Sequence, residues 1–262
     1  MASTGDRHRG RAEDVAGRDD LTPEAAAVLL PGEAIVRPTA GETLDALSSD
    51  LVAQALTCVR SFGSFHLAVG GDRSLDALYM RLMSDPDARA LPWDRTHLWL
   101  THEHDAAGGG GAVFAGVRDY LVGHSGIPAA QVHAIDLSSA SAAGAYESAL
   151  RAELGARAHG RDRLDAAVMS LDADGAIGGR AIFGPTDTPR DRVCAGAGER
   201  AVALTREFLN ASRLIAVLAL GRAQSRAVAH AAARADEITL GPVAGELRWY
   251  LDAEAAGAEP DH

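Results

Sequence analysis

The chain has 262 residues, of which 47% are hydrophobic and 23% charged, and its formal net charge at pH 7 is −11. This composition predicts one large or two small domains with a well-buried core, and the acidic charge argues against nucleic acid or an anionic membrane as a partner, because both bind basic surfaces. All 25 basic residues are arginine, which excludes Schiff-base catalysis and the P-loop, since both need a lysine amine.

The first segment of the chain, residues 1–22, is polar and has no hydrophobic periodicity, so we expect a disordered tail. It lacks the apolar core of a signal peptide, and no later run approaches the length of a membrane span, which predicts a cytoplasmic protein. Residues 23–256 are expected to form a single domain, followed by a flexible tail over 257–262. Cys58 and Cys194 are too few and too far apart for a zinc knuckle or a disulfide framework.

The domain alternates short apolar runs with stretches of helical periodicity, which predicts an α/β protein with a mostly parallel central sheet in a three-layer α/β/α arrangement. The expected helices cover 42–62, 76–84, 114–125, 139–154, 205–212, 222–235 and a closing segment, 245–256. The expected strands cover 64–71, 96–105, 164–171 and 213–221. In such sheets the ligand lies outside the carboxyl ends of the strands, so the loops that follow these four strands are the candidate site.

The second expected strand ends in the sequence THEHD. Its alternation places His102 and His104 on one face and Glu103 on the other, with Asp105 nearby. Two imidazoles on one side of a strand end could ligate a divalent metal ion or share acid–base chemistry. The same spacing also occurs in surface loops that bind nothing, so both readings stay open. No other cofactor is expected.

The loop after the first expected strand reads GGDRS. Its glycines leave room for backbone amides, and the N-terminus of the next helix favours an anion such as phosphate. Asp72 would repel that anion unless it pairs with Arg73. The alternative is a tight strand-to-helix turn without a ligand. The residues predicted to bind phosphate, here and in later loops, are Gly70, Gly71, Arg73, Ser74, Arg180, Arg222 and Arg226.

The loop after the third expected strand reads DADGAIGGR. Asp174 could act as a general base if burial or Asp172 raises its pKa, and Arg180 could then stabilise an oxyanion. An Asp-x-Asp-Gly segment is also an ordinary turn, in which aspartate side chains accept local backbone N–H groups.

The order and spacing of these loops resemble the 6-phosphogluconolactonase and glucosamine-6-phosphate isomerase family, over residues 32–253. The family's phosphate loop S-G-G-S-T-P is similar to VGGDRS, its P-I-P-A-E-N-V-H-R-I turn to GIPAAQVHAI, its L-N-A-A-R-R-V to LNASRLI, and its closing G-E-L-T-W-L to GELRWYL. The resemblance implies the family's fold for the domain over 23–256 and a small-molecule sugar phosphate or sugar lactone as the ligand.

The functional loops depart from the family pattern. The histidine of the lactonase signature G-x-G-x-D-G-H-T-A-S-L-F-P, which the family uses as general base, falls on Ala176. The aspartate and arginine of the family's G-D-E-R segment fall on His102 and His104. The serine and asparagine of S-N-Y fall on Ala112 and Val113, and the late lysine falls near Gln224.

The sequence therefore predicts a divergent member of the family that hydrolyses or binds a phosphorylated sugar lactone or a related sugar phosphate. The residues predicted to replace the missing base are Asp174, His102, His104, Glu103 and Asp172. Two alternatives stay open: a catalytically inactive pseudoenzyme that binds a ligand or a partner, and an enzyme repurposed for another biosynthetic reaction. The sequence sets no oligomeric state.

Overall fold

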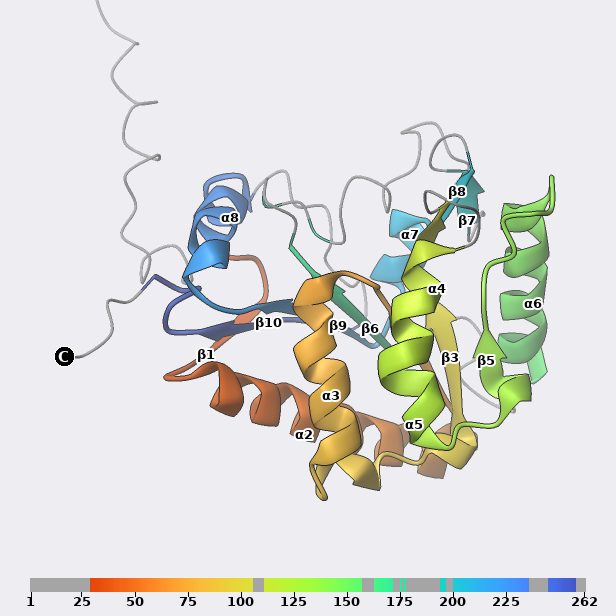
Figure 1. Ribbon diagram of the computed structural model, residues 1–262, viewed down its shortest axis with the longest axis horizontal. Coiled ribbons are helices and arrows are strands. Elements are labelled where there is room, and N and C mark those ends of the chain that lie inside the picture. Colours follow the sequence, from red (N-terminus) through yellow and green to blue (C-terminus); the bar gives the residue numbers. More distant parts are fainter. Residues whose placement is uncertain are drawn as a thin grey trace, which may run out of the picture.

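The computed structural model describes residues 29–105, 111–156, 163–171, 175, 177, 194–196, 200–235 and 245–257. Within them, seven strands form a parallel sheet in the order β1-β10-β9-β6-β2-β3-β5, shown in Figure 1. Their bounds in that order are Glu33–Arg37, Glu246–Asp252, Leu214–Ala219, Ala166–Ser170, Phe65–Val69, Thr96–Leu100 and Val132–His133. A second, antiparallel sheet has the order β4-β8-β7, with bounds His102–His104, Ala201–Leu204 and Cys194–Gly196.

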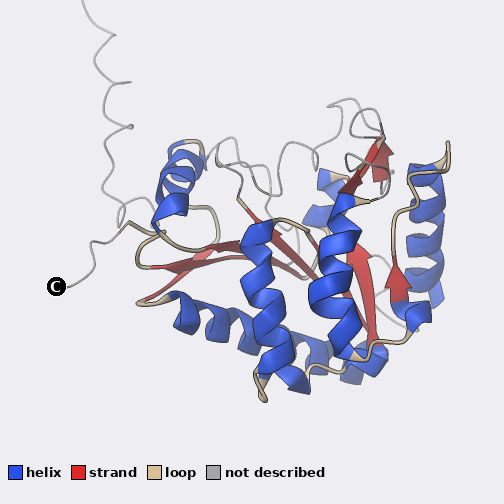
Figure 2. Ribbon diagram, viewed as in Figure 1, coloured by secondary structure: helices blue, strands red, loops and turns tan. Residues whose placement is uncertain are grey.

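Helices cover both faces of the parallel sheet. They are α2 (Ala40–Phe62), α3 (Asp76–Ser84), α4 (Ala112–Val117), a π-helical turn η4 (Arg118–Val122), α5 (Gly123–Ser125), α6 (Ala142–Ala156), α7 (Arg206–Asn210) and α8 (Arg222–Ala233). Short 3₁₀ turns are η1 (Arg73–Leu75), η2 (Ala88–Ala90), η3 (Trp93–Arg95) and η5 (Ala129–Gln131). In Figure 2, α3 and the α4–α5 segment lie in front of the sheet. Right-handed crossovers with this strand order place α6, α7 and α8 on the opposite face.

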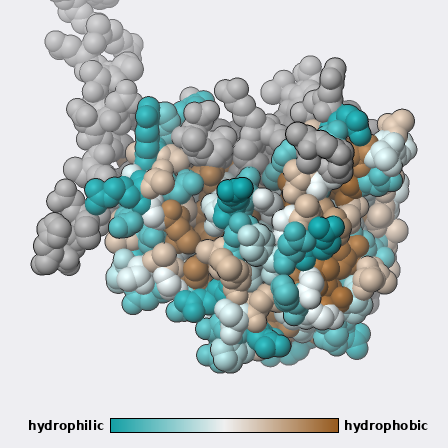
Figure 3. Space-filling view, viewed as in Figure 1, coloured by the Kyte–Doolittle hydropathy of each residue, from teal (hydrophilic) through white to brown (hydrophobic). Residues whose placement is uncertain are grey.

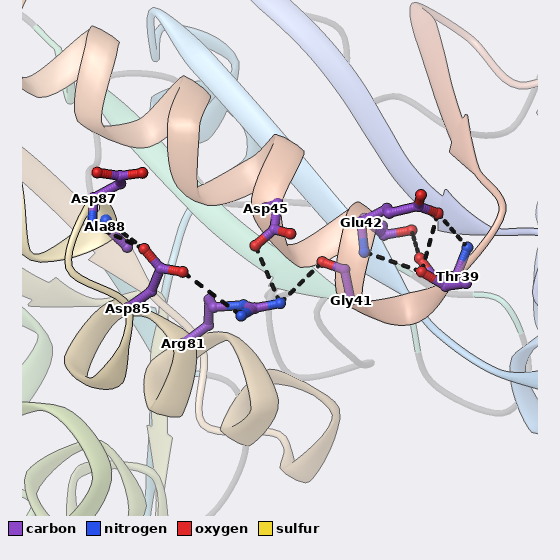
Figure 4. A network of polar contacts seen from close by, with 9 residues as sticks. Thr39, Gly41, Glu42, Asp45, Arg81, Asp85, Asp87 and Ala88 are labelled. Atoms are coloured by element: carbon purple, nitrogen blue, oxygen red, sulfur yellow. Dashed lines mark hydrogen bonds and ion pairs between the residues drawn. The ribbon is translucent and has the colours of Figure 1, made fainter.

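Helix α2 begins and ends where its sequence specifies. Thr39 and Glu42 form a capping box, and Gly63 ends the helix with φ of 86°. The apolar stripe from Leu44 to Cys58 is buried as its spacing predicts. Arg81 of α3 binds the Asp45 carboxylate at 3.1 Å and the Gly41 carbonyl at 3.3 Å, which ties α3 to the first two turns of α2 (Figure 4).

The three central strands are buried along their whole length. Every residue of β2, β6 and β9 is buried, because helices cover both faces of the parallel sheet. The predicted α/β/α class with a mostly parallel sheet is confirmed. The described residues contain no helix that is long and apolar enough to span a membrane.

Two element predictions were wrong. The closing segment 245–256 is not a helix: residues 246–252 form β10, which is hydrogen-bonded between β1 and β9, so sheet pairing determines its conformation. The stretch 96–105 is two strands rather than one. β3 ends at Leu100, and the Thr101 carbonyl accepts the N–H of Leu204, after which the chain pairs as β4 with β8. The predicted tail 1–22 lies outside the described residues.

Candidate functional site

The loop after β2 is a tight turn at the carboxyl edge of the sheet. The Gly70 N–H donates to the Val168 carbonyl of β6 at 3.1 Å, and the buried Tyr79 hydroxyl of α3 donates to the Gly70 carbonyl. A Cβ on Gly71 would lie 2.5 Å from Cγ1 of Val113 in α4. Glycine is therefore required at position 71 for the loop to approach α4, whether or not the loop also binds a ligand.

Asp72 connects this loop to the end of β6. Its carboxylate oxygen Oδ2 accepts the Ser170 hydroxyl at 2.7 Å. Arg73, whose pairing with Asp72 would have been needed to offset the repulsion of a phosphate, is exposed and forms no ion pair with Asp72 within the part of the chain that the structure describes. Ser74 is half-buried in η1. The negative charge of the loop is thus held on a carboxylate that is bonded to a neutral hydroxyl.

His102 lies close enough to that carboxylate for the charge of Asp72 to act on its ring. Its side chain is buried, with 4% of its surface exposed, and its Nδ1 lies 3.1 Å from the Thr101 hydroxyl. Burial lowers the pKa of His102 below its ordinary value; His104 lowers it further, whereas the charge of Asp72 opposes the shift. The Nε2 atom has no hydrogen-bond partner among the described residues. This imidazole is neutral near pH 7 and keeps one ring nitrogen free for proton transfer.

Glu103 points the other way, as the alternation of β4 predicts. Its side chain is fully buried, and its carboxylate accepts the N–H groups of His104, Val113 and Phe114 at 2.8–2.9 Å. A Cβ on Gly111 would lie 2.2 Å from Glu103 Oε2, so a larger residue there would displace this carboxylate from its three N–H donors. The carboxylate caps the N-terminus of α4 and fixes β4 against it. Its predicted catalytic role stays a prediction.

His104 and Asp105 lie further out on β4. The His104 ring stacks on that of His102, with centroids 6.1 Å apart, but its side chain is exposed. Asp105 forms an ion pair of 3.0 Å with Arg200. Among the described residues, no three His, Cys, Asp or Glu side chains are placed to hold a metal ion. The predicted metal site at His102 and His104 has no third ligand in this set and stays a prediction.

The third loop falls largely outside the described residues. Asp172, Asp174, Arg180 and Ala176 all lie there, so their predicted roles stay predictions. Gly175 is described: its φ is +77°, and a Cβ there would lie 2.6 Å from the Ala227 carbonyl of α8. Glycine is therefore required at this position for the loop to pack on α8.

The fourth loop precedes α8. Gly221 donates its N–H to both carboxylate oxygens of Asp252, each at 2.9 Å, and Arg222 donates its N–H to Glu254 at 3.3 Å. The side chains of Arg222 and Arg226 are exposed. The buried Oε1 atom of Gln224 has no hydrogen-bond partner among the described residues.

The sequence did not identify Ser170, which donates to Asp72, or Thr101, which lies within hydrogen-bonding distance of His102, as site residues. Ser170 is the last residue of β6 and Thr101 follows β3, so both are polar residues at the end of a buried strand. That position at the end of a strand was the signal in the sequence that could have identified them.

A hollow of about 560 Å³ lies elsewhere, between α3 and η4, and contains none of the predicted site residues. It is lined by Met80, Met83, Ser84, Arg89, Asp119, Tyr120 and His124. Figure 3 shows this face, where hydrophobic and hydrophilic side chains intermix.

Comparison with known proteins identifies the family. The family model of glucosamine-6-phosphate isomerases and 6-phosphogluconolactonases matches residues 38–247. The chain belongs to this family. The GDH/6PGL endoplasmic bifunctional protein of Homo sapiens is 26% identical over 234 residues, which are 82% of this chain and 29% of that protein. The corresponding protein of Oryctolagus cuniculus is 28% identical over 235 residues, which are 82% of this chain and 28% of that protein. The chain thus spans less than a third of the length of these relatives.

Solved structures share the fold. The 6-phosphogluconolactonase of Thermotoga maritima superposes with a TM-score of 0.65 at 16% identity, covering 84% of this chain and 99% of that one. A monomeric glucosamine-6-phosphate deaminase superposes with a TM-score of 0.60 at 15% identity, covering 87% of this chain and 100% of that one. The family resemblance predicted from the sequence is confirmed.

Proposed function

We propose that the protein is a 6-phosphogluconolactonase-like hydrolase that opens the ring ester of a sugar lactone, with His102 as its general base. The observation that carries the proposal is the position of His102, a buried imidazole at the carboxyl edge of the sheet that is within the electrostatic influence of Asp72. Membership of the family supports the class of reaction. The ligand is a small sugar derivative, as the family's description implies.

The proposed reaction uses the neutral form of His102. Its Nε2 accepts a proton from water while the water oxygen attacks the lactone carbonyl carbon. The tetrahedral intermediate then expels the ring oxygen, which takes the proton back from the imidazolium, and the product is the open hydroxy acid. Asp72 stabilises the imidazolium, because a nearby negative charge favours the protonated ring. No redox or group-carrying cofactor is needed for these steps.

Three residues of the third loop are proposed to take part in the same scheme. Asp174, assisted by Asp172, is proposed as a second proton acceptor, and Arg180 as the group that stabilises the oxyanion. A divalent metal ion at His102 and His104 is proposed only as an alternative way to activate the water.

A second candidate function is a binding module without catalysis. It is favoured by two observations: alanine occupies position 176, where the family signature has its histidine, and the Glu103 carboxylate is engaged in capping α4. Under this alternative the same edge binds a sugar derivative or a partner. An enzyme repurposed for another biosynthetic reaction is a third candidate.

The test is to follow acid release from freshly prepared 6-phosphoglucono-1,5-lactone and glucono-1,5-lactone against spontaneous hydrolysis, with and without added zinc or manganese. We expect a rate above background with at least one lactone. Because burial lowers the pKa of His102, the base stays neutral as the pH falls through 6.5, and kcat/KM declines only at lower pH. Background rates with both lactones under all metal conditions would contradict hydrolysis. A ligand-induced rise in Tm would then support the binding module.

A further inference from the structure

The loop after β2 combines a backbone suited to an anion with an acidic side chain that accepts hydrogen bonds from a ligand. Its two glycines and the start of the following helix turn would attract a phosphate. Two carboxylates, Asp72 and Asp76, stand in this segment beside one guanidinium, Arg73, which is exposed. The charge of Arg73 acts on Asp76, whose pKa it lowers, although burial outweighs that effect. Asp72 is left with its neutral partner Ser170.

The Asp72 carboxylate has acceptor capacity to spare. An ionised carboxylate offers about four lone-pair positions. Ser170 occupies one of them, on Oδ2, and Oδ1 has no hydrogen-bond partner among the described residues. Burial is only partial at this residue, so a ligand in the turn can reach it. A ligand hydroxyl would donate to this carboxylate, whereas a phosphate would offer it only like charge and acceptor oxygens.

A second acceptor without a donor lies on the same edge. Gln224 is in the first turn of α8, just after β9, and the turn η1 packs against β9. Its Oε1 atom is buried and has no hydrogen-bond partner in the described part of the chain. The chain contains no lysine, and the side chains of Arg222 and Arg226 on either side of Gln224 are exposed. Asp72 and Gln224 therefore both offer this edge an acceptor oxygen that is not in use, whereas the donors of the neighbouring arginines lie on exposed side chains.

We infer that this edge takes an unphosphorylated sugar lactone, whose hydroxyl groups donate to Asp72 and Gln224, and that Asp72 is the residue that excludes a phosphorylated one. The inference rests on the proposed function for the reaction itself. The ring ester bond between the carbonyl carbon and the ring oxygen breaks, the water oxygen bonds to that carbon, and the product is an aldonic acid that carries no phosphate.

The experiment compares kcat/KM for glucono-1,5-lactone and 6-phosphoglucono-1,5-lactone with the full-length chain. The natural protein should prefer glucono-1,5-lactone by about tenfold or more, because like charges brought together in a site oppose binding. Asp72→Asn keeps the shape and removes the charge. It should shift the ratio of the two kcat/KM values toward the phosphorylated lactone by ~10-fold. The same substitution also removes the charge that stabilises the His102 imidazolium, but this lowers kcat/KM for both lactones alike and leaves their ratio unchanged.

Asp119→Asn is the matched control, since Asp119 is an exposed carboxylate of η4 outside this edge, and its ratio should equal that of the natural protein. A natural protein that prefers the phosphorylated lactone, or a ratio that Asp72→Asn does not change, would overturn the inference. If neither lactone is hydrolysed above background, the proposed reaction fails. Calorimetric titration with gluconate and 6-phosphogluconate then still decides the inference, because tighter binding of 6-phosphogluconate would refute it and tighter binding of gluconate would uphold it.

Discussion

Three stacked histidines lie in β2, β3 and β5 of the parallel sheet, whereas His102 lies beyond the carboxyl end of β3, in β4, and the surroundings of the two groups differ. Toward the amino ends of β2 and β3, the rings of His66 and His97 stack with centroids 4.5 Å apart, and His133 of β5 stacks on Trp99 at 3.7 Å. At the carboxyl edge, His102 is buried, its Nδ1 lies near the Thr101 hydroxyl, and the charge of Asp72 acts on its ring. Figure 1 shows β3 next to β5, toward one end of the parallel sheet.

The difference is in where the ring nitrogens are bonded. In the stacked group, Trp99 donates its indole N–H to Nδ1 of His66 at 3.2 Å, and Nδ1 of His97 lies 3.2 Å from Nε2 of His133. These rings satisfy one another, so they contribute packing and hydrogen bonds to the fold. His102 keeps its Nε2 free beside a carboxylate. A buried histidine indicates chemistry only when a nitrogen is left over and a charge is present to stabilise its protonated form.

The largest expected effect is on activity: a substitution of His102 should impair catalysis, whereas a substitution in the stacked group should impair stability. His102→Gln should lower kcat/KM for the lactone by ~10²–10⁴-fold, because the amide cannot accept the proton of the attacking water. His97→Gln, in the stacked group, should change kcat/KM by less than about threefold while lowering Tm. Steady-state kinetics and thermal unfolding of both variants check this. Equal losses of activity in the two variants would remove the distinction.

The next effect tests the stacked group directly. Trp99→Leu removes the face-to-face contact with His133 and the N–H donated to His66, and it leaves space in a fully buried site. We expect the free energy of unfolding to fall by about 2–4 kcal/mol. Urea denaturation measures this change. The control is Leu56→Ala, which shortens an exposed leucine and should lower the free energy of unfolding far less. A loss below about 1 kcal/mol for Trp99→Leu would show that the stack contributes little.

A smaller effect concerns pH. Burial, and then the neighbouring His97, lower the pKa of His133 to about 4, from 6.5 in an unfolded chain. The unfolded state therefore binds more protons between these values, and stability falls as the pH drops from 6.5 toward 4. After discounting for solvent screening of this partly exposed ring, the loss is about 1–2 kcal/mol. Denaturation of the natural protein and of His133→Gln at pH 7.5 and pH 5 measures it, and the variant should lose less stability between the two pH values.

The smallest effect concerns the arginines of α8. Arg222→Ala and Arg226→Ala remove exposed side chains, and with an unphosphorylated substrate we expect kcat/KM to change by less than about twofold. Kinetics with glucono-1,5-lactone check this. A tenfold loss of kcat/KM in either variant would show that the substituted arginine binds the ligand, as the sequence predicted.

The sequence was sufficient for most of the fold because its signals are local. The stripe from Leu44 to Cys58 and the apolar run of β6 each specify their element without reference to the rest of the chain. β10 was misread because its conformation depends on two strands that flank it, not on its own periodicity.

The candidate site was predictable only as a set of loops. The carboxyl-edge rule placed Asp72 and His102 correctly at one edge. It could not give the bond from Ser170 to Asp72, which joins residues 98 positions apart. Nor could it give the cap that Glu103 forms on α4, because that depends on how closely Gly111 lets the helix approach.

The pairing of β1 with β10 has a consequence for biosynthesis. β1 is an edge strand whose one neighbour in the sheet is β10, and β10 follows β9 along the chain. During translation, β1 emerges from the ribosome before the other described strands, but its partner in the sheet is absent until residues 246–252 have been made. The core around β2, β3 and β6 can assemble earlier, whereas β1 must wait. Synthesis of residues 246–252, rather than folding of the strands made earlier, therefore sets the moment at which this edge of the sheet closes.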